Sequence, residues 1–524
     1  MEQDNRIKRK EIVSLFLKNR ALVSPDILEQ LEKESAESLG RLISKKNSED
    51  ILVFDKNTKQ RQEATSDGVN WQEIERSKAF FEKGRLKLSQ TETHIAQKPT
   101  ESARQNNTKT IFSYTDESKK REVQDFVKLF NHRYVAIEKL LRNRQELQST
   151  TSIKRISSKK EREGVCFIGM VTGKKQTKNN NLALTLEDPT GTINVIINKN
   201  RPELFEAARS IVLDEVIGVT GTNGDRIVFA NNLLWPEVPI TKELKKSHDE
   251  AYALFLSDLH VGSKNFLYED FNRFIKWLNG NTGSDKQKEI SSKVKYAFIA
   301  GDLVDGCGVY PDQEKELDID DIYRQYAACA DLLSQFPKEV QIILCPGNHD
   351  AMRIAEPQPP LYTDFAKPIY ALKNTTIVSN PAIVNIHSSE NFSGFDVLLY
   401  HGYSFDYFVS NVDSIRTKGG YDRADIIMKF LLKRRHLAPT HTSTLYIPDT
   451  NRDPLVIEKI PDFFATGHIH KSIVANYRNI TLVSGSCWQS KTAFQEKVGH
   501  NPEPSRVPAI NLMTREAKIL KFGK

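Results

Sequence analysis

The second half of the chain contains five short apolar segments that each run directly into side chains able to bind metal ions. Carboxylate, imidazole and amide groups mix oxygen and nitrogen donors, which suit manganese, iron or zinc better than an all-oxygen magnesium site. One such fragment is a weak signal, but five in succession predict a metal centre. The segments and the residues after them are YALFLS with Asp258 and His260, YAFIA with Asp302 and Asp305, VQIILC with Asn348, His349 and Asp350, VLLY with His401, and FFAT with His468 and His470.

Two divalent ions held by such residues would favour hydrolysis of a phosphodiester. At neutral pH this reaction needs an activated water and neutralisation of the charge on both the entering and the leaving oxygen, which two ions about 3.5 to 4 Å apart can supply. One carboxylate must then bridge the ions. We expect manganese in both positions, with iron, zinc and magnesium as alternatives.

The metal-type residues need a scaffold that brings them to one place. Short apolar runs bounded by glycine are typical of buried strands. Gly301, Gly347 and Gly467 allow a tight turn without a Cβ beside a charged substrate. We therefore expect five strand ends to present their side chains at one rim, with His468 and His470 on the same face.

Across residues 252–490 the order of these fragments resembles that of the calcineurin-like metallophosphoesterases. The resemblance implies two facing β-sheets flanked by helices, and it implies a role for each ligand. Asp258, His260 and His470 would bind the first ion, Asp302 would bridge both ions, and Asn348, His401 and His468 would bind the second.

The same resemblance implies two catalytic residues beside the ligands. His349 would stabilise the transition state or protonate the leaving oxygen, and Asp350 would orient the His349 ring. His349 would thus act on the substrate, whereas its neighbour Asn348 would act on an ion.

Segments between the fragments carry a narrower resemblance, to the small subunits of archaeal family-D DNA polymerases. These segments are GCGVYPDQEKELDIDDIYRQYAACADLLSQFP after the second fragment, GNHDAMRIAEPQPP at the third, RRHLAPTH near 434–441 and SGSCWQSKTAFQ near 485–495. The resemblance spans nearly the whole chain. It implies a 3′ to 5′ proofreading exonuclease that forms a heterodimer with a large catalytic subunit and acts on the primer 3′ end or single-stranded DNA. Related eukaryotic B subunits have lost their metal ligands, whereas this sequence keeps all of them.

Two other functions stay open at the level of sequence. A non-catalytic assembly subunit of the polymerase would use the same domains only to hold its partner, and it would not need the complete ligand set. A free-standing protein phosphatase or cyclic-nucleotide esterase would need the ligands, but a barrel and a basic N-terminal part would be unusual additions. An assay that compares p-nitrophenyl phosphate with single-stranded DNA as substrate separates such a phosphatase or esterase from the exonuclease.

The chain of 524 residues is too long for one core, and its composition changes along its length. We expect an α+β multidomain protein. Its parts are a small helical module at 1–45, a polar disordered linker at 46–117, a helix and basic connector at 118–163, an oligonucleotide/oligosaccharide-binding (OB) fold barrel at 164–240, and a calcineurin-like metallophosphoesterase domain, a two-sheet β-sandwich flanked by helices, at 250–524. Apolar residues at helical spacing from about 120 to 146 predict packing rather than a binding site.

Residues 164–240 contain five short strand-like runs divided by turns. Asp188-Pro189-Thr190-Gly191 predicts a hairpin, because proline presets the turn and glycine tolerates positive φ. OB barrels often bind single strands by stacking bases on aromatic rings, and the candidates here are Phe167, Phe229 and Trp235. A barrel that only docks onto a neighbouring domain is the alternative.

The composition excludes several classes of protein. With 39% hydrophobic and 27% charged residues, and no apolar run of about 18 residues, we expect no membrane span. The N-terminus lacks the features of a secretory signal, so we expect a cytoplasmic protein. Five scattered cysteines without a C-x-x-C pair argue against a disulfide framework and a zinc ribbon. Basic residues exceed acidic ones by eight within residues 1–165, which suits either DNA binding or a solvated arm.

Overall fold

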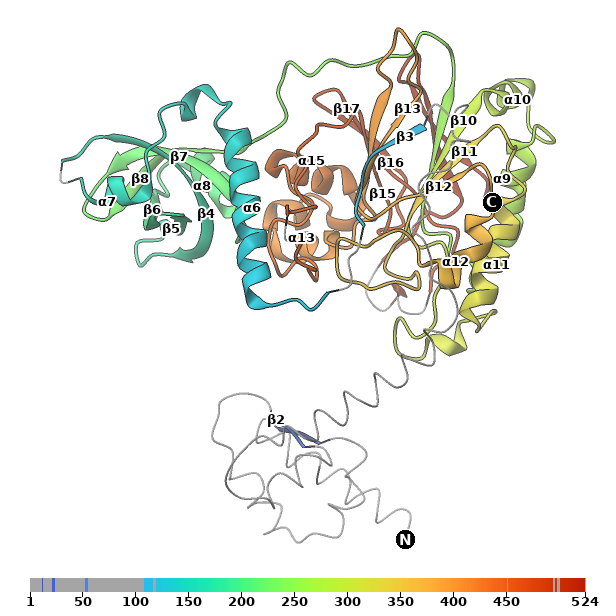
Figure 1. Cartoon of the computed structure of the whole chain (residues 1–524), viewed down its shortest axis with the longest axis horizontal. Coiled ribbons are helices and arrows are strands. Elements are labelled where there is room, and N and C mark those ends of the chain that lie inside the picture. The colour runs from blue at the N-terminus through green and yellow to red at the C-terminus, as the bar shows by residue number, and fades with distance from the viewer. Residues whose placement is uncertain are drawn as a thin grey trace. The chain divides into compact units, whose positions relative to one another are not determined.

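The computed structural model describes residues 108–523 apart from 116–118, 160, 450, 493–494 and 497–499, and before residue 108 it describes only Ile12 and two short strands. The chain divides into two compact units, residues 1–101 and 102–524. In the first unit, β1 (Ala21–Val23) pairs in parallel with β2 (Leu52–Phe54) (Figure 1). β1 falls in the predicted helical module and β2 in the predicted linker, so these six residues differ from the prediction. The rest of both segments before residue 108 lies outside the described residues.

The five strands predicted between residues 164 and 240 are present, and they close into a barrel of strand order β4-β5-β6-β8-β7. The predicted hairpin joins β5 to β6, where Asp188 Oδ1 accepts a hydrogen bond from the Thr190 N–H at 2.7 Å. The elements are β4 (Gly164–Gln176), β5 (Leu182–Asp188), β6 (Gly191–Ile197), α8 (Pro202–Arg209), β7 (Val216–Asn223) and β8 (Ile227–Leu234).

The three aromatic residues predicted as stacking candidates have different environments. Phe167 and Trp235 are buried in the barrel core, and the Trp235 indole donates to Glu215 Oε2 at 3.0 Å. The stacking prediction is therefore wrong for these two residues, because their rings fill the core. Phe229 is 43% exposed and stays a candidate.

The second unit also contains two six-stranded sheets. The first, of order β12-β11-β10-β9-β18-β19, consists of β9 (Tyr252–Leu256), β10 (Val294–Ala300), β11 (Gln341–Cys345), β12 (Thr375–Ile377), β18 (Arg506–Asn511) and β19 (Ala517–Lys521). The second, of order β16-β17-β15-β14-β13-β3, consists of β3 (Thr108–Ser113), β13 (Ala382–Ile386), β14 (Phe395–Leu399), β15 (Phe463–Thr466), β16 (Ile473–Tyr477) and β17 (Ile480–Ser484).

The two sheets face each other across a layer of buried side chains. The ring centroid of Phe255 in β9 lies 5.1 Å from that of Phe298 in β10 and 5.8 Å from that of Phe463 in β15. Phe463 in turn lies 5.5 Å from Phe395 in β14, and all four rings are buried. Strands covered on both faces need apolar residues at every position, which explains the continuous apolar runs of the sequence.

Helices cover the outer face of each sheet. The first sheet packs in one buried cluster with α9 (Tyr268–Leu278), α10 (Asp285–Ser292), α11 (Ile322–Leu333) and α12 (Thr363–Tyr370). The second packs with α13 (Phe405–Asn411), α14 (Asp413–Arg416) and α15 (Ala424–Arg434). Short 3-10 turns lie at η3 (Gln313–Lys315) and η4 (Gly420–Asp422). Among the described residues, none of the helices has the length and apolar character to cross a membrane.

The predicted linker ends earlier than residue 117. β3 pairs antiparallel with β13 at the edge of the second sheet. An edge strand forms backbone hydrogen bonds on one side only and needs little apolar surface, and the segment TKTIFS has only two large apolar residues. Composition alone therefore did not reveal this strand, and pairing with β13 determines its structure.

α6 (Val123–Leu141) connects the barrel to the two-sheet domain, and Figure 1 shows it between them. It lies where the sequence predicted a helix, and Tyr134 and Ile137 pack against the barrel as part of one apolar cluster. From the same helix, Arg133 donates to Asp453 Oδ2 at 2.7 Å in the two-sheet domain. The short elements η2 (Gln145–Leu147) and α7 (Ile153–Ser157) follow.

Candidate metal centre

Five strand ends bring the predicted site residues to one rim of the two-sheet domain. β9, β10 and β11 run parallel to one another, as do β14 and β15, so their carboxyl ends lie at one edge of each sheet. Because the sheets face each other, residues from both edges meet. They are Asp258 and His260 after β9, Asp302 after β10, Asn348, His349 and Asp350 after β11, His401 after β14, and His468 and His470 after β15.

The first group of predicted ligands is Asp258, His260 and His470, all of them buried. His260 Nε2 lies 3.2 Å from His470 Nε2, which lies 3.5 Å from Asp258 Oδ1. His260 Nδ1 lies 3.1 Å from Asp305 Oδ1, and this contact fixes the ring and leaves Nε2 with its lone pair available. Three donor atoms thus converge.

The second group surrounds His401 and Asp302. His401 Nε2 lies 2.9 Å from Asn348 Oδ1 and 3.3 Å from Asp302 Oδ2. The other ring nitrogen, Nδ1, donates to the Ala300 carbonyl oxygen at 2.8 Å. His260 Nε2 of the first group lies 3.9 Å from the same Asp302 oxygen. Asp302 therefore lies between the two groups, where a bridging carboxylate would have to be.

His468 adjoins the second group from β15. Its backbone N–H donates to the Asp258 carboxylate at 3.0 Å, and its ring centroid lies 5.2 Å from that of His401. Its Nε2 lies 3.0 Å from Asp406 Oδ2. Because Nε2 is occupied by this contact, Nδ1 is the nitrogen that remains for an ion.

Five of the seven predicted ligands have a left-handed backbone conformation. The φ angle is +50° at Asp258, +52° at His260, +51° at Asp302, +72° at His468 and +54° at His470. Residues with a Cβ rarely adopt this conformation, which costs of order 1 to 3 kcal/mol each and persists only where the surrounding structure enforces it. Strain concentrated at one set of strand ends is typical of a functional site.

Glycines beside these residues leave room for them. A Cβ on Gly467 would lie 2.6 Å from Asp258 Oδ2, and a Cβ on Gly347 would overlap the Asp302 carboxylate. Gly301 has a φ of +85°, which favours glycine at the turn before Asp302. The glycines of these fragments are therefore explained by close approach to the ligands.

Burial and neighbouring charge set the protonation of the second group. Burial alone would raise the pKa of Asp302, but His401 and His349 hold that pKa well below its usual value. Burial would likewise lower the pKa of His401, but the carboxylates of Asp302 and Asp258 raise it to about 10. The group thus favours ionised carboxylates, which attract cations.

The donor atoms and their spacing fit two divalent ions. Atoms that share one ion at about 2.1 Å lie about 3.0 to 3.4 Å apart in octahedral or tetrahedral geometry. The separations of 2.9, 3.2, 3.3 and 3.5 Å found here are close to these values. Mixed imidazole, carboxylate and amide donors favour manganese, iron or zinc. The number and identity of the ions stay predictions.

His349 lies beside both groups. Its ring centroid is 4.6 Å from that of His260, and its backbone N–H donates to Asp302 Oδ1 at 2.8 Å. Its ring Nδ1 lies 2.8 Å from the Asp305 carbonyl oxygen. The ring is therefore oriented by the backbone of the Asp302 loop.

Asp350 does not have the role that the sequence predicted. Its buried carboxylate accepts hydrogen bonds from the Gly347 N–H at 2.8 Å and from the Tyr326 hydroxyl at 3.2 Å, and burial raises its pKa to about 7. The expectation that Asp350 orients the His349 ring is wrong. Buried N–H groups of the loop require an acceptor, and Asp350 supplies it beneath the site.

The sequence interpretation assigned no role to four supporting residues, although it noted Asp305 after the second apolar segment. Asp305 holds His260 and accepts hydrogen bonds from Gln489 Nε2 at 2.9 Å and Gln313 Nε2 at 3.1 Å. Asp305 closes the G-D-x-x-D fragment, so its spacing from Asp302 was a usable signal. Gln489, Gln313 and Asp406 reach the site from other loops and a helix, and no local pattern marks them.

A cavity of about 240 Å³ opens over the donors and connects them to solvent. Beyond the ligands, its lining includes Tyr310, Ile354, Tyr403, Gln495 and His500. Aromatic and aliphatic side chains around a polar floor suit a substrate that combines a charged phosphate with a flat base.

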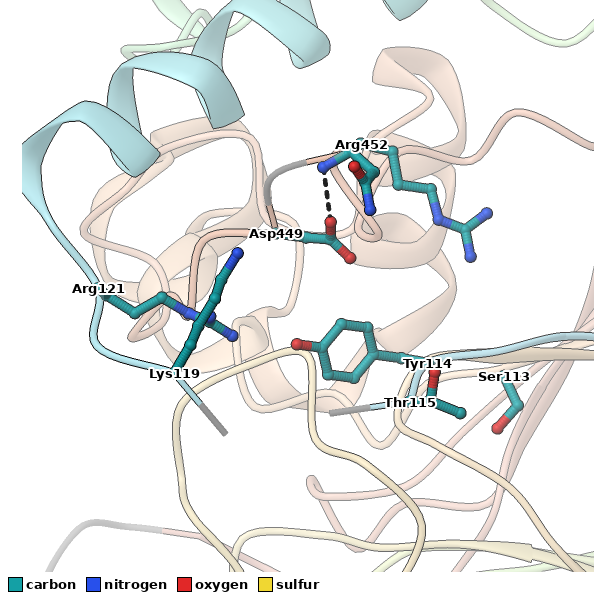
Figure 2. Close-up of a pocket in the computed structure, with 8 residues that line it drawn as sticks. Ser113, Tyr114, Thr115, Lys119, Arg121, Asp449 and Arg452 are labelled. Atoms are coloured by element: carbon teal, nitrogen blue, oxygen red, sulfur yellow. Dashed lines mark hydrogen bonds between the residues drawn. The ribbon is translucent and has the colours of Figure 1, made fainter. Parts of the chain in front are cut away.

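A second polar pocket, of about 210 Å³, is lined by none of the predicted ligands (Figure 2). Figure 2 shows Lys119 and Arg121 on one side of it and Tyr114 on another. Asp449 Oδ1 accepts a hydrogen bond from the Asn451 N–H at 2.8 Å. This pocket is distinct from the candidate metal centre.

The chain is similar over most of its length to known archaeal proteins. It is 39% identical over 402 residues to the DNA polymerase II small subunit of Methanothermobacter thermautotrophicus, covering 77% of this chain and 80% of that protein. It is 41% identical over 387 residues to the protein of the same name from Archaeoglobus fulgidus, covering 74% of each. For Pyrococcus furiosus the values are 39% over 404 residues, 76% of this chain and 64% of that protein.

The chain belongs to the archaeal DNA polymerase II small-subunit family. Residues 253–474 of this small subunit match the family of DNA polymerase alpha/epsilon B subunits, a range that contains every predicted site residue. Residues 165–226 match the OB-fold nucleic acid binding domain, which confirms the predicted barrel type. The predicted resemblance to the family-D small subunits is confirmed.

Proposed function

We propose that this polymerase small subunit is a 3′ to 5′ proofreading exonuclease and that residues 250–524 form a calcineurin-like metallophosphoesterase domain. The observation that carries the proposal is the meeting of donor atoms from five strand ends, 2.9 to 3.5 Å apart, beneath one cavity. A subunit that served only to assemble the polymerase would not need buried, strained aspartates and histidines at one point.

Two divalent ions in this site would supply an activated water and neutralise the charge on the phosphate oxygens. The chain's own residues hold the geometry for that chemistry. Asp305 and Asp406 orient the rings of His260 and His468, and the backbone N–H of His349 orients the Asp302 carboxylate. Because the ligands are positioned before substrate arrives, little reorganisation remains for the reaction itself.

His349 is the group proposed to act on the leaving oxygen. Its Nδ1–H donates to the Asp305 carbonyl, so Nε2 is the nitrogen available to substrate. In the protonated ring, Nε2–H can donate to the oxygen that gains charge as the P–O bond breaks. Proton donation of this kind contributes about 10² to 10⁴ in rate.

Membership of a polymerase family makes DNA the proposed substrate and a large catalytic subunit the proposed partner. The primer 3′ end or a single strand would enter the cavity, and Phe229 on the barrel is exposed for stacking. Since β3 and α6 are integral to the folded unit, we expect residues 108–524 to suffice for binding the large subunit.

Primers labelled at the 3′ or the 5′ end test the proposed activity, with manganese and with the chain alone or bound to its large subunit. We expect mononucleotides from the 3′ end. Asp302→Ala should abolish their release, and Asp331→Ala, an exposed residue of α11, serves as the matched control. Cleavage of p-nitrophenyl phosphate without cleavage of DNA would indicate a phosphatase, and cleavage of neither would indicate an assembly subunit.

A further inference from the structure

Two buried amide side chains connect the backbones that carry Asn348 and His401. Gln358 Nε2 donates to the carbonyl oxygen of Gly347, the residue before Asn348, at 3.0 Å. The backbone N–H of His401 donates to Asn380 Oδ1 at 2.9 Å. Asn380 Nδ2 donates to Gln358 Oε1 at 2.7 Å. A continuous chain of hydrogen bonds therefore runs from Gly347, the neighbour of one predicted ligand of the second ion, to the backbone of His401, another predicted ligand.

The orientation of both amides is determined by their partners. Asn380 must present its oxygen to the His401 N–H, so its NH₂ group faces Gln358. Gln358 must then present its oxygen to Asn380, and its two N–H bonds go to the carbonyl oxygens of Gly347 and Arg353, the latter at 2.9 Å. If either side-chain amide were rotated by 180°, two hydrogen-bond donors or two acceptors would face each other. The pair therefore has one stable arrangement.

The surrounding structure holds this pair in place. Gln358 and Asn380 also exchange two backbone hydrogen bonds, at 2.8 and 2.9 Å, and both side chains are at most 2% exposed. The buried Glu356 accepts a hydrogen bond at 3.0 Å from the hydroxyl of Tyr400, which precedes His401. Without competing water, a hydrogen bond in this environment fixes distances strongly.

We propose that Gln358 and Asn380 are positioning residues that set the separation of Asn348 and His401 and thereby the affinity of the second ion. The separation concerned is the 2.9 Å between Asn348 Oδ1 and His401 Nε2. The first group, Asp258, His260 and His470, has no link to the pair in these hydrogen bonds. The effect is therefore selective for one ion. This inference rests on the proposed metal-dependent function.

Isosteric substitutions test the inference on the full chain. Gln358→Met and Asn380→Leu remove the link while preserving volume. Asn385→Leu is the matched control, because Asn385 is also buried and also joins two segments, donating to Asp396 Oδ1 at 3.0 Å, but at the opposite end of β14. Bound manganese is measured by elemental analysis and calorimetric titration, and 3′ cleavage is measured across manganese concentrations.

The parent protein should bind two manganese ions per chain. In both link variants we expect the affinity of one ion to fall about 10- to 100-fold, the range typical of groups behind metal ligands, while the other ion keeps its affinity. Cleavage should recover at saturating manganese. Asn385→Leu should keep the metal dependence of the parent even where its melting temperature falls equally.

Two results would overturn the inference. One is parental binding of both ions by Gln358→Met and Asn380→Leu. The other is a loss of both ions together in step with thermal stability, as a purely structural role requires. If the parent protein binds two ions but cleaves no DNA, the proposed nuclease activity is wrong. The positioning role of Gln358 and Asn380 is then tested by the manganese titrations alone. If the parent binds no ions, the positioning role fails with it.

Discussion

Two clusters of buried charge lie within residues 102–524, and they differ in how their charges are balanced. The metal-type cluster consists of Asp258, His260, Asp302, His401 and His470. The seam cluster, where α6 and the barrel meet the two-sheet domain, consists of Arg133, Glu215, Arg434, His436 and Asp453.

In the seam cluster every carboxylate has a guanidinium partner from another element. Arg133 Nε lies 2.7 Å from Asp453 Oδ2, and Arg434 Nε lies 2.8 Å from Glu215 Oε2, with all four side chains at most 2% exposed. His436 Nε2 lies 2.9 Å from the same Asp453 oxygen. The charges are neutralised within the fold, so this cluster requires no ligand.

The metal-type cluster has two carboxylates and no guanidinium among its members. Its imidazoles are themselves predicted metal ligands, and their donor atoms point at one another or at Asp302 across 3.2 to 3.9 Å. Asp258, His260, Asp302 and His470 are also left-handed, whereas none of the five seam residues is. The comparison teaches that burial of charged groups alone does not indicate a functional site. Donor atoms that converge on one point from a strained backbone do indicate one.

The largest expected effect is the loss of activity in Asp302→Ala and in His468→Ala. Groups that stabilise charge in active sites are individually worth about 10² to 10³ in rate, and these two would also hold ions, so we expect a loss of at least about 10³-fold in 3′ cleavage. Because the site lies at strand ends, the unfolding transition should stay close to that of the parent. If either variant cleaved DNA at the parental rate, the metal-type cluster would have no more claim to a catalytic role than the seam cluster.

His349→Ala, beside the metal-type cluster, should separate metal binding from catalysis. We expect cleavage to fall by about 10² to 10⁴ with both ions still bound, whereas Asn348→Ala should lower occupancy of the second ion. Elemental analysis, DNA anisotropy and single-turnover cleavage on the same preparations measure this. Metal loss equal to that of Asn348→Ala, or cleavage unchanged at full occupancy, would contradict the proposed role.

Arg133→Met should affect stability rather than chemistry. Removing the guanidinium leaves the buried Asp453 with His436 and the Leu455 N–H as partners and no cationic guanidinium, and breaking a buried ion pair typically costs about 3 to 5 kcal/mol in unfolding free energy. Urea unfolding measures the loss, and the folded fraction should retain the metal affinity of the parent. The double variant Arg133→Met with Asp453→Asn should lose less than the single one, since it leaves no unpaired carboxylate.

The smallest expected effect is that of Asp305→Asn. Asp305 supports His260 without being a predicted ligand, so we expect a fall of about 10- to 100-fold in affinity for the first ion only. Asn can keep the hydrogen bond in part, so cleavage should recover at high manganese. Equal weakening of both ions in a manganese titration would mean that the two groups do not act separately.

Much of the site was predictable because its residues follow strands in the sequence. The five apolar runs became five buried strands, and the side chains after them do meet. The role of Asp350 was not predictable, because an aspartate can either accept hydrogen bonds from buried N–H groups or orient a histidine ring. The residue type is the same in both cases, so the sequence does not distinguish them. Asp406 and Gln489 are distant in sequence from His468 and Asp305, the residues that they contact at the site, so no spacing rule could find them.

The sequence by itself determined which metal-type residues follow each strand and which glycines leave room for them. It also determined the helix at 123–141 and the five-stranded barrel, because local periodicity and turn chemistry are short-range properties. Only the tertiary structure decided that residues 108–113 complete the second sheet, that Phe167 and Trp235 fill a core, and that Gln358 and Asn380 join the loops of two predicted ligands. These features depend on pairing and burial between segments distant in the chain, and such contacts leave no period in the sequence.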